Sequence, residues 1–169
     1  MVLLLTVNQW ARTNIQHFGG DVNRVFIFGT SAGSASVHYH ILSPMSKGLF
    51  HTAFSGSGSA LNPWAFQPDP IPNGKKIAKM HGCPTETSKM LVECLRTKDA
   101  HDIAFSHSKF LDFYSDPIAA FGPSLENENG NPDESYSRFL TDAPINLIDK
   151  GEVNEVPWII GFDTDEGYE

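Results

Sequence analysis

The feature that most constrains the fold is an apolar strand that runs into a glycine-flanked serine and then into a helix of small residues. Residues 25–28 form a continuous apolar run of strand length, which is typical of a parallel strand buried on both faces. A G-x-S-x-G motif occupies residues 29–33, and helical spacing continues to Leu42. A second short strand is predicted over residues 52–55. Strand, helix and strand within about 30 residues make a right-handed βαβ unit, which indicates the α/β class.

The rest of the chain is predicted to alternate between helices and loops before a third strand. The sequence predicts a helix over residues 1–17, a proline-rich irregular connection over 62–74, helical segments over 74–105 that break at Cys83-Pro84, a loop over 121–134, short helices near 135–140 and 144–150, and a strand over 157–162. Three strands that are apolar on both faces would leave long apolar edges unpaired. We therefore expect the chain to form only part of a mostly parallel sheet with flanking helices.

Charge and hydropathy exclude several classes of partner. The chain has 12 Lys and Arg against 20 Asp and Glu, a net charge of -8, so we expect no nucleic-acid partner. No apolar run approaches the roughly 20 residues of a membrane-spanning helix, and the apolar opening is too short for a signal peptide. His38 and His40 stand two apart on a predicted helix and cannot bind one metal ion together. We expect no membrane span, no export signal in this chain and no metal site.

The G-x-S-x-G motif has the context of a nucleophile elbow, because it lies between an apolar strand and a helix of small residues. In such an elbow a sharp, strained turn projects the Ser31 Oγ from the carboxyl edge of the sheet, and Gly29 and Gly33 leave room for a close approach. The helix would place the Ala32 backbone N–H where a tetrahedral oxyanion develops. The alternative is an ordinary strand-to-helix turn in which Ser31 only caps the helix.

Further motifs extend this pattern along the chain. They are Phe18-Gly19-Gly20-Asp21, Arg24-Val25, Leu42-Ser43-Pro44, Gly48-Leu49-Phe50-His51, Ser57-Gly58-Ser59 and Pro157-Trp158-Ile159-Ile160-Gly161. Together with the G-x-S-x-G motif, this set resembles the type-B carboxylesterase/cholinesterase family of α/β-hydrolases, in particular insect carboxylesterases. The resemblance implies that residues 1–169 are the central part of a single α/β-hydrolase domain. The family's upstream Gly-rich oxyanion loop and its downstream catalytic His region would then lie outside this chain.

The resemblance implies a Ser-Glu-His triad that is only partly present. Ser31 matches the nucleophile, Ala32 an oxyanion donor, and Glu166 the triad acid that orients the imidazole. The alternative for Glu166 is a solvated acidic loop shared with Asp163 and Asp165. The triad of an α/β-hydrolase follows the order Ser, acid, His, and all 7 histidines precede Glu166, so the general base is expected after residue 169. We therefore expect these residues alone to show little esterase activity.

Four more residues match family positions. Ser57 resembles a serine close to the triad, and Trp64 resembles a wall of the acyl pocket. Packing under the proline-rich connection is the alternative for Trp64. Cys83 and Cys94 match an intrachain disulfide of the family, and two buried thiols are the alternative.

The function that the resemblance implies is hydrolysis of a small-molecule carboxylic ester through an acyl-enzyme, with no cofactor or metal, in a secreted parent protein. Thr30 stands where many members have Glu, which argues against a choline-ester specialist because the substrate cation would lose a negative partner. The alternatives are a catalytically inactive cholinesterase-like adhesion or binding protein and a non-functional truncation product.

Overall fold

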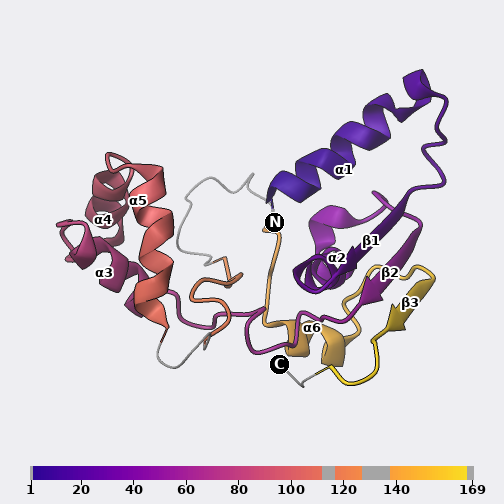
Figure 1. Cartoon of the computed structure of the whole chain (residues 1–169). Coiled ribbons are helices and arrows are strands. Elements are labelled where there is room, and N and C mark those ends of the chain that lie inside the picture. Colours follow the sequence, from indigo (N-terminus) through magenta and orange to yellow (C-terminus); the bar gives the residue numbers. More distant parts are fainter. Residues whose placement is uncertain (1, 112–116, 127–137, 167–169) are drawn as a thin grey trace. The chain divides into compact units, whose positions relative to one another are not determined.

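The structure of the chain, a computed structural model, describes residues 2–111, 117–126 and 138–166. It divides into two compact units. The first, the sheet unit, comprises Met1–Phe66 and Leu125–Glu169, and the second, the helical unit, comprises Gln67–Ser124 (Figure 1). The predicted nucleophile and the predicted triad acid both belong to the sheet unit.

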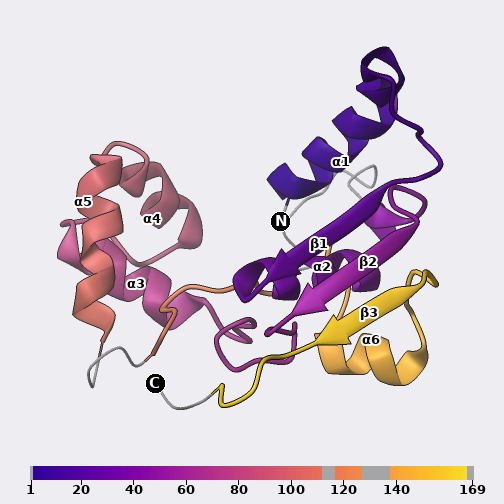
Figure 2. The same ribbon diagram turned by 45° about the vertical axis from the view of Figure 1, so that its right-hand side comes forward.

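The sheet unit is built on a three-stranded parallel sheet, a partial α/β-hydrolase fold. Its elements are α1 (Val2–Asn14), η1 (Ile15–Phe18), β1 (Phe26–Thr30), α2 (Ala32–Leu42), η2 (Pro44–Ser46), β2 (Thr52–Gly56), α6 (Pro144–Lys150) and β3 (Trp158–Gly161). The strand order is β1-β2-β3, so β2 is central, and Figure 2 shows the three arrows pointing the same way. The predicted βαβ unit is confirmed, with α2 as the helix that connects β1 to β2.

The register of the sheet brings all three strand ends to one edge. Thr30 pairs with Gly56, and Gly56 pairs with Gly161, each the last residue of its strand. The pairing continues one residue further, because the Ser31 N–H donates to the Gly56 oxygen at 3.0 Å and the Ser57 N–H donates to the Gly161 oxygen at 2.9 Å. The loops that follow β1, β2 and β3 therefore all leave the sheet at its carboxyl edge.

Helix α2 packs against the sheet and forms the centre of the core. Of its 11 residues, 8 are buried. The apolar core around it contains Leu5, Val37, Tyr39, Ile41, Leu42, Leu49, Phe50, Ala53, Ala60, Phe139, Leu140 and Leu147. The Tyr39 hydroxyl is satisfied inside this core because it donates to the Ala65 oxygen at 2.6 Å. Each large apolar side chain buried here stabilises the fold by roughly 1.5–3 kcal/mol.

The strands are less buried than their sequences predict. Phe26 and Phe28 of β1 are 53% and 73% exposed, and their rings stack with centroids 5.6 Å apart. Ile159 and Ile160 of β3 are 66% and 63% exposed. The prediction of strands buried on both faces is therefore wrong for β1 and β3. Helix α2 covers one face of the sheet, and among the described residues Phe26 stays half exposed and Phe28 largely exposed.

Several predicted helix boundaries also differ. The first helix ends at Asn14 and continues as the 3₁₀ turn η1, which Gly19 ends with a φ of 79°. The expected irregular connection over residues 62–74 gives way to a helix at Ile71. The expected helix near residues 135–140 is not present over 138–140, and residues 135–137 lie outside the described ranges. None of the helices described is both long and apolar enough to cross a membrane.

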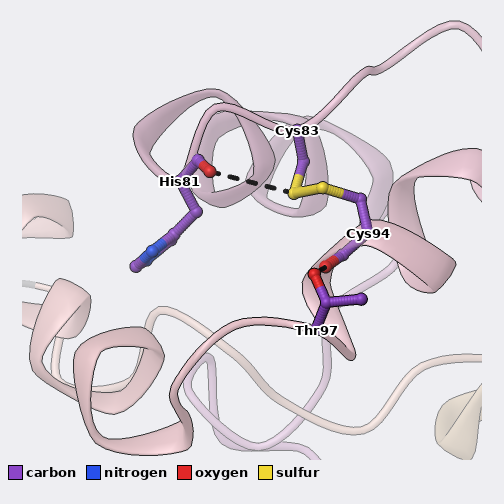
Figure 3. The surroundings of a disulfide bond; sticks show 4 residues. All are labelled: His81, Cys83, Cys94 and Thr97. Atoms are coloured by element: carbon purple, nitrogen blue, oxygen red, sulfur yellow. Dashed lines mark hydrogen bonds between the residues drawn. A yellow bond between two sulfur atoms is a disulfide. The ribbon is translucent and has the colours of Figure 1, made fainter.

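The helical unit is held together by a disulfide. Its elements are α3 (Ile71–Met80), α4 (Ser88–Leu95), α5 (Ala100–Phe105) and η3 (Ser106–Phe110). Cys83 and Cys94, whose Cα atoms lie 5.7 Å apart, join the loop after α3 to α4, and the Thr97 hydroxyl donates to the Cys94 oxygen at 2.7 Å (Figure 3). Thr87 caps α4 by accepting a hydrogen bond from the Met90 N–H at 3.2 Å. The disulfide that the resemblance implies is therefore present, and the alternative of two thiols is wrong.

We expect the double variant Cys83→Ser, Cys94→Ser to destabilise the helical unit. The disulfide joins residues 11 apart in sequence, and releasing that constraint on the unfolded chain costs about 2–3 kcal/mol. Native-state hydrogen exchange of the α3 and α4 amides in the full-length protein measures this loss, with the amides of α2 as the internal control. Unchanged protection of α3 and α4 in the double variant would contradict the prediction.

His40 is a titratable side chain enclosed in the core of the sheet unit. It is 3% exposed, its Nδ1 lies 2.8 Å from the Ser46 Oγ, and its ring stands edge-on to Phe139 with centroids 5.4 Å apart. Burial lowers the pKa of His40 to about 4, because the imidazolium would lose its hydration. His38 is also buried, and burial lowers its pKa in the same direction. The fold therefore favours the neutral form of both histidines.

We expect the sheet unit to lose stability as the pH falls from 6.5 to about 4. In this range the unfolded chain protonates His40 near its ordinary pKa of 6.5, whereas the folded chain does so only near 4, so the unfolded state binds more protons. The stabilisation is complete above pH 6.5, and the loss by pH 4 is on the order of 1–3 kcal/mol. Urea unfolding across this range measures the pH dependence of the free energy of unfolding.

His40→Asn should flatten that pH dependence, and His17→Asn, at an exposed position, should leave it unchanged. An equally steep dependence in the His40→Asn protein would show that another group is responsible.

Candidate active site

Ser31 forms the sharp turn between β1 and α2. Its backbone conformation is one that residues other than Gly rarely adopt. Its φ is 56° and its ψ is -121°. The turn is held by the Ser31 N–H bond to Gly56 and by the Ala35 N–H, which donates to the Ser31 oxygen at 3.0 Å. The Ser31 side chain is exposed and makes no capping hydrogen bond to α2. An ordinary helix cap is defined by that bond, so the geometry favours a nucleophile elbow.

Close packing explains the first glycine of the motif. A Cβ at Gly29 would lie 2.3 Å from the carbonyl carbon and oxygen of Gly33, far inside van der Waals contact. A Cβ at Gly33 would meet, within 4 Å, no described atom beyond its chain neighbours and the nearby backbone of α2 itself. The prediction that both glycines leave room for a close approach is therefore confirmed for Gly29 and wrong for Gly33 in the described part of the chain. The two glycines differ because Gly29 on β1 faces the backbone of Gly33, so only a side chain at residue 29 would collide with it.

The turn after β2 packs directly against the Ser31 turn. Ser57 has a φ of 55°, so the chain bends sharply where β2 ends. A Cβ on Gly58 would lie 2.3 Å from the Ser31 carbonyl oxygen, so the two backbones are in contact. Ser57 thus lies in the loop beside Ser31 at the carboxyl edge, and its role in catalysis stays a prediction.

Two buried serines, which the sequence analysis does not single out, connect this turn to the sheet. Ser34 on α2 is 0% exposed and donates from its Oγ to the Gly58 oxygen at 2.5 Å. Ser55 on β2 donates to the Ser34 oxygen at 3.5 Å and accepts from the Trp158 Nε1–H at 3.0 Å. The sequence signal that could have found them is a hydroxyl at positions that the helical and strand patterns predict to be buried.

Glu166 lies in the loop that follows β3. The loop turns at Asp165, whose φ is 63°, and the Glu166 Oε1 accepts a hydrogen bond from the Asp163 N–H at 3.1 Å. The side chain is exposed, and among the residues described it bonds within this loop and to no histidine. Because β3 ends in register with β1, this loop leaves the same edge of the sheet as Ser31. That Glu166 is the triad acid stays a prediction.

Ala32 and Trp64 are the remaining predicted site residues. Ala32 is the first residue of α2, and N–H groups of the first helical turn have no partner within the helix. Its N–H therefore suits an anionic oxygen next to Ser31. Trp64 is half-buried in a turn in which the Ala65 N–H donates to the Asn62 oxygen at 2.9 Å. Its place in an acyl pocket stays a prediction.

His38 and His40, the two buried histidines of the described ranges, pack in the core of the sheet unit rather than at the candidate site. The His38 Nδ1 accepts from the Ala60 N–H at 3.3 Å, and its ring packs on Trp158 with centroids 4.9 Å apart. None of the described histidines hydrogen-bonds to Ser31 or to Glu166. The same ranges contain no group of three or more His, Cys, Asp or Glu side chains that could hold a metal ion.

A cavity of about 840 Å³ lies at the opposite end of the strands. Its walls include Phe50 and His51, which precede β2, and Val156, which precedes β3. Parallel strands begin at this edge and end at the edge that carries Ser31. The sheet therefore separates the cavity from Ser31, and the cavity is not part of the candidate active site.

Known proteins match the chain over nearly its whole length. The model of the Carboxylesterase family matches residues 5–169. Venom carboxylesterase-6 of Apis mellifera and Esterase E4 of Myzus persicae are each 42% identical to it over 159 residues, which is 94% of this chain and 28% and 27% of those proteins. Juvenile hormone esterase of Tribolium castaneum is 37% identical over 163 residues, 94% of this chain and 27% of that protein. The chain thus spans little more than a quarter of the length of these relatives.

We expect Gly29→Ala to disrupt the Ser31 turn and Gly33→Ala to leave it intact. The methyl group at residue 29 would collide with backbone atoms, which cannot rotate away, so we expect a loss of about 2–3 kcal/mol. At residue 33 the methyl group meets no described atom beyond its chain neighbours and the nearby backbone of α2, and Ala in place of a helical Gly stabilises a helix by about 0.5–1 kcal/mol. Urea unfolding of both variants of the full-length protein measures the difference. Equal unfolding midpoints would be inconsistent with the close contact at Gly29.

Proposed function

Because this chain belongs to the carboxylesterase family, we propose that it is the central part of a single α/β-hydrolase domain in a serine carboxylesterase. The complete protein would hydrolyse small-molecule carboxylic esters through an acyl-enzyme. In this proposal Ser31 is the nucleophile, the Ala32 N–H is one oxyanion donor and Glu166 is the triad acid. The second oxyanion donor and the general-base His come from parts of the protein outside residues 1–169, so these residues alone are expected to be nearly inactive.

The observation that carries the proposal is the backbone conformation of Ser31 at the shared edge of the sheet. A φ of 56° and a ψ of -121° at a non-Gly residue are costly, and such strain clusters at functional sites. The conformation exposes Ser31 immediately before the N-terminus of α2, whose positive dipole end favours a developing anion. The loop that carries Glu166 leaves the same edge, which supports a shared role for the two residues.

The proposed reaction has two steps with the same chemistry. In acylation the Ser31 Oγ bonds to the ester carbonyl carbon while its proton passes to the His imidazole, and the Ala32 N–H donates to the oxyanion that forms. The ester C–O bond then breaks, and the alcohol leaves with the proton from the imidazolium. Water attacks the acyl-enzyme in the same way and releases the acid and free Ser31. This sequence of steps needs no cofactor or metal.

Glu166 would orient the imidazole and stabilise its cation. Its Oε1 accepts from the Asp163 N–H in the loop after β3, which leaves Oε2 for the imidazole N–H. The bond to Asp163 would thereby fix the carboxylate in one orientation.

The proposal extends to the kind of ester and to the location of the protein. Thr30, next to the nucleophile, supplies no carboxylate for a cationic alcohol, which supports neutral esters as substrates. Secretion is supported by the disulfide between Cys83 and Cys94, because such bonds persist in oxidising compartments, and by a relative named for venom. The net charge of -8 supports the absence of a nucleic-acid partner.

In the full-length protein, we expect Ser31→Ala to abolish covalent labelling by a fluorophosphonate probe and to lower kcat for a small aryl ester by at least about 10³-fold, because the attacking oxygen is lost. Glu166→Gln should lower kcat by about 10²–10⁴-fold and slow the labelling, because the imidazolium loses its anionic partner. Steady-state kinetics and the rate of labelling measure both effects.

Ser36→Ala on α2 is the matched control and should keep nearly normal rates. Retention of turnover by Ser31→Ala would show that Ser31 is not the nucleophile. Absence of labelling and turnover in the well-folded unmodified protein would favour the inactive binding protein instead.

A further inference from the structure

We propose that the buried hydroxyl of Ser34 is a positioning group for the nucleophile: it fixes the Gly58 turn, and the Gly58 turn in turn fixes the backbone of Ser31. The inference rests on the proposed function, because it concerns how well Ser31 is placed for attack. It assigns to Ser34 a role in the reaction rate and not only in folding.

The first step of the argument is the contact between Gly58 and Ser31. A Cβ on Gly58 would lie 2.3 Å from the Ser31 carbonyl oxygen and 2.9 Å from its carbonyl carbon, so no side chain separates the two backbones. Any movement of the Gly58 turn toward α2 would therefore push the Ser31 peptide. The Ser31 peptide also contains the Ala32 N–H, the proposed oxyanion donor. The position of Gly58 thus affects both the nucleophile, Ser31, and the oxyanion donor, the Ala32 N–H.

The second step is the hydrogen bond that holds Gly58 in place. The Ser34 Oγ donates to the Gly58 oxygen at 2.5 Å, between residues 24 apart in sequence. A serine inside a helix commonly bonds back to the carbonyl four residues earlier, as Ser36 does to the Ala32 oxygen at 2.8 Å. Ser34 instead uses its hydroxyl across the interface between α2 and the turn after β2. Ser34 is 0% exposed, so water cannot replace the bond from its side.

The third step is the support that the sheet gives to Ser34. The Ser55 Oγ donates to the Ser34 oxygen at 3.5 Å and accepts from the Trp158 Nε1–H at 3.0 Å. These two hydrogen bonds connect Trp158 on β3 to Ser55 on β2, and Ser55 to Ser34 on α2. The bond from Ser55 is long, so the direct bond from Ser34 to Gly58 should carry most of the effect.

The consequence for catalysis follows from the strain in the Ser31 turn. A strained conformation persists only where its surroundings over-determine it. Removing the Ser34 hydroxyl leaves the Gly58 oxygen without its donor and allows the turn to shift by a few tenths of an ångström. Groups that react must be held within about 0.5 Å of the productive geometry, so the attack by Ser31 slows while substrate binding elsewhere in the pocket does not change.

Ser34→Ala in the full-length protein tests this inference. We expect kcat for a small aryl ester and the rate constant for fluorophosphonate labelling to fall about 5- to 50-fold, with KM within about twofold of the unmodified value. Rates are expressed per active site, from the labelling end point, so that unfolded protein does not count. Ser36→Ala, which removes a hydroxyl from the same helix, is the matched control and should keep both rates.

Ser34→Cys provides a graded comparison, because a thiol is a weaker donor of similar size. Its labelling rate should fall between those of the unmodified protein and Ser34→Ala, and it supplies the test if Ser34→Ala does not fold. Rates per active site equal to those of the Ser36→Ala control would overturn the positioning role, as would a Ser34→Cys protein as fast as the unmodified one. Failure of the proposed function is distinguishable, because then either the unmodified protein would not be labelled or Ser31→Ala would still be labelled.

Discussion

The alignment of three parallel strand ends is the constraint on which the candidate site depends. Because Thr30, Gly56 and Gly161 pair in register, three loops leave the sheet at one edge, and the N–H groups of Ser31 and Ser57 extend the pairing into those loops. A shift of the register by one residue would remove these bonds and turn every side chain of the strand to the other face. Residues more than 130 positions apart in the chain are thus brought to one edge by backbone pairing, without a direct contact between their side chains.

The turn at Ser31 depends on two glycines, Gly29 and Gly58, because neither has a Cβ. Gly29 and Gly58 each bring backbone within a distance that a Cβ would block, one from the strand before Ser31 and one from the turn beside it. The turn at Ser31 is therefore closely packed at the Gly33 backbone and at the Ser31 carbonyl, and hydrogen bonds at the Ser31 N–H and oxygen anchor it. The Ser34 hydroxyl then holds the Gly58 turn through its hydrogen bond to the Gly58 oxygen.

Local patterns predict the elements of the sheet unit well, and their surroundings poorly. The βαβ unit and the bounds of α2 follow from apolar spacing and from the glycine-flanked serine. Apolar composition does not reveal which face of β1 has a neighbour, so the exposure of Phe28 is unexpected. Around Phe139 a tertiary bond replaces the predicted helix, because its N–H donates to the Glu126 Oε2 at 2.7 Å. Ser34 escapes prediction because its partner is 24 residues away, beyond any local pattern.

The stacked rings of Phe26 and Phe28 have a consequence for how the protein reaches its folded state. They form an uncharged, β-prone segment on the outer strand of the described sheet, and such a segment pairs with other chains when it stays uncovered during synthesis. Within the described sheet, β1 is therefore the edge at which pairing with another chain is favoured while it stays uncovered.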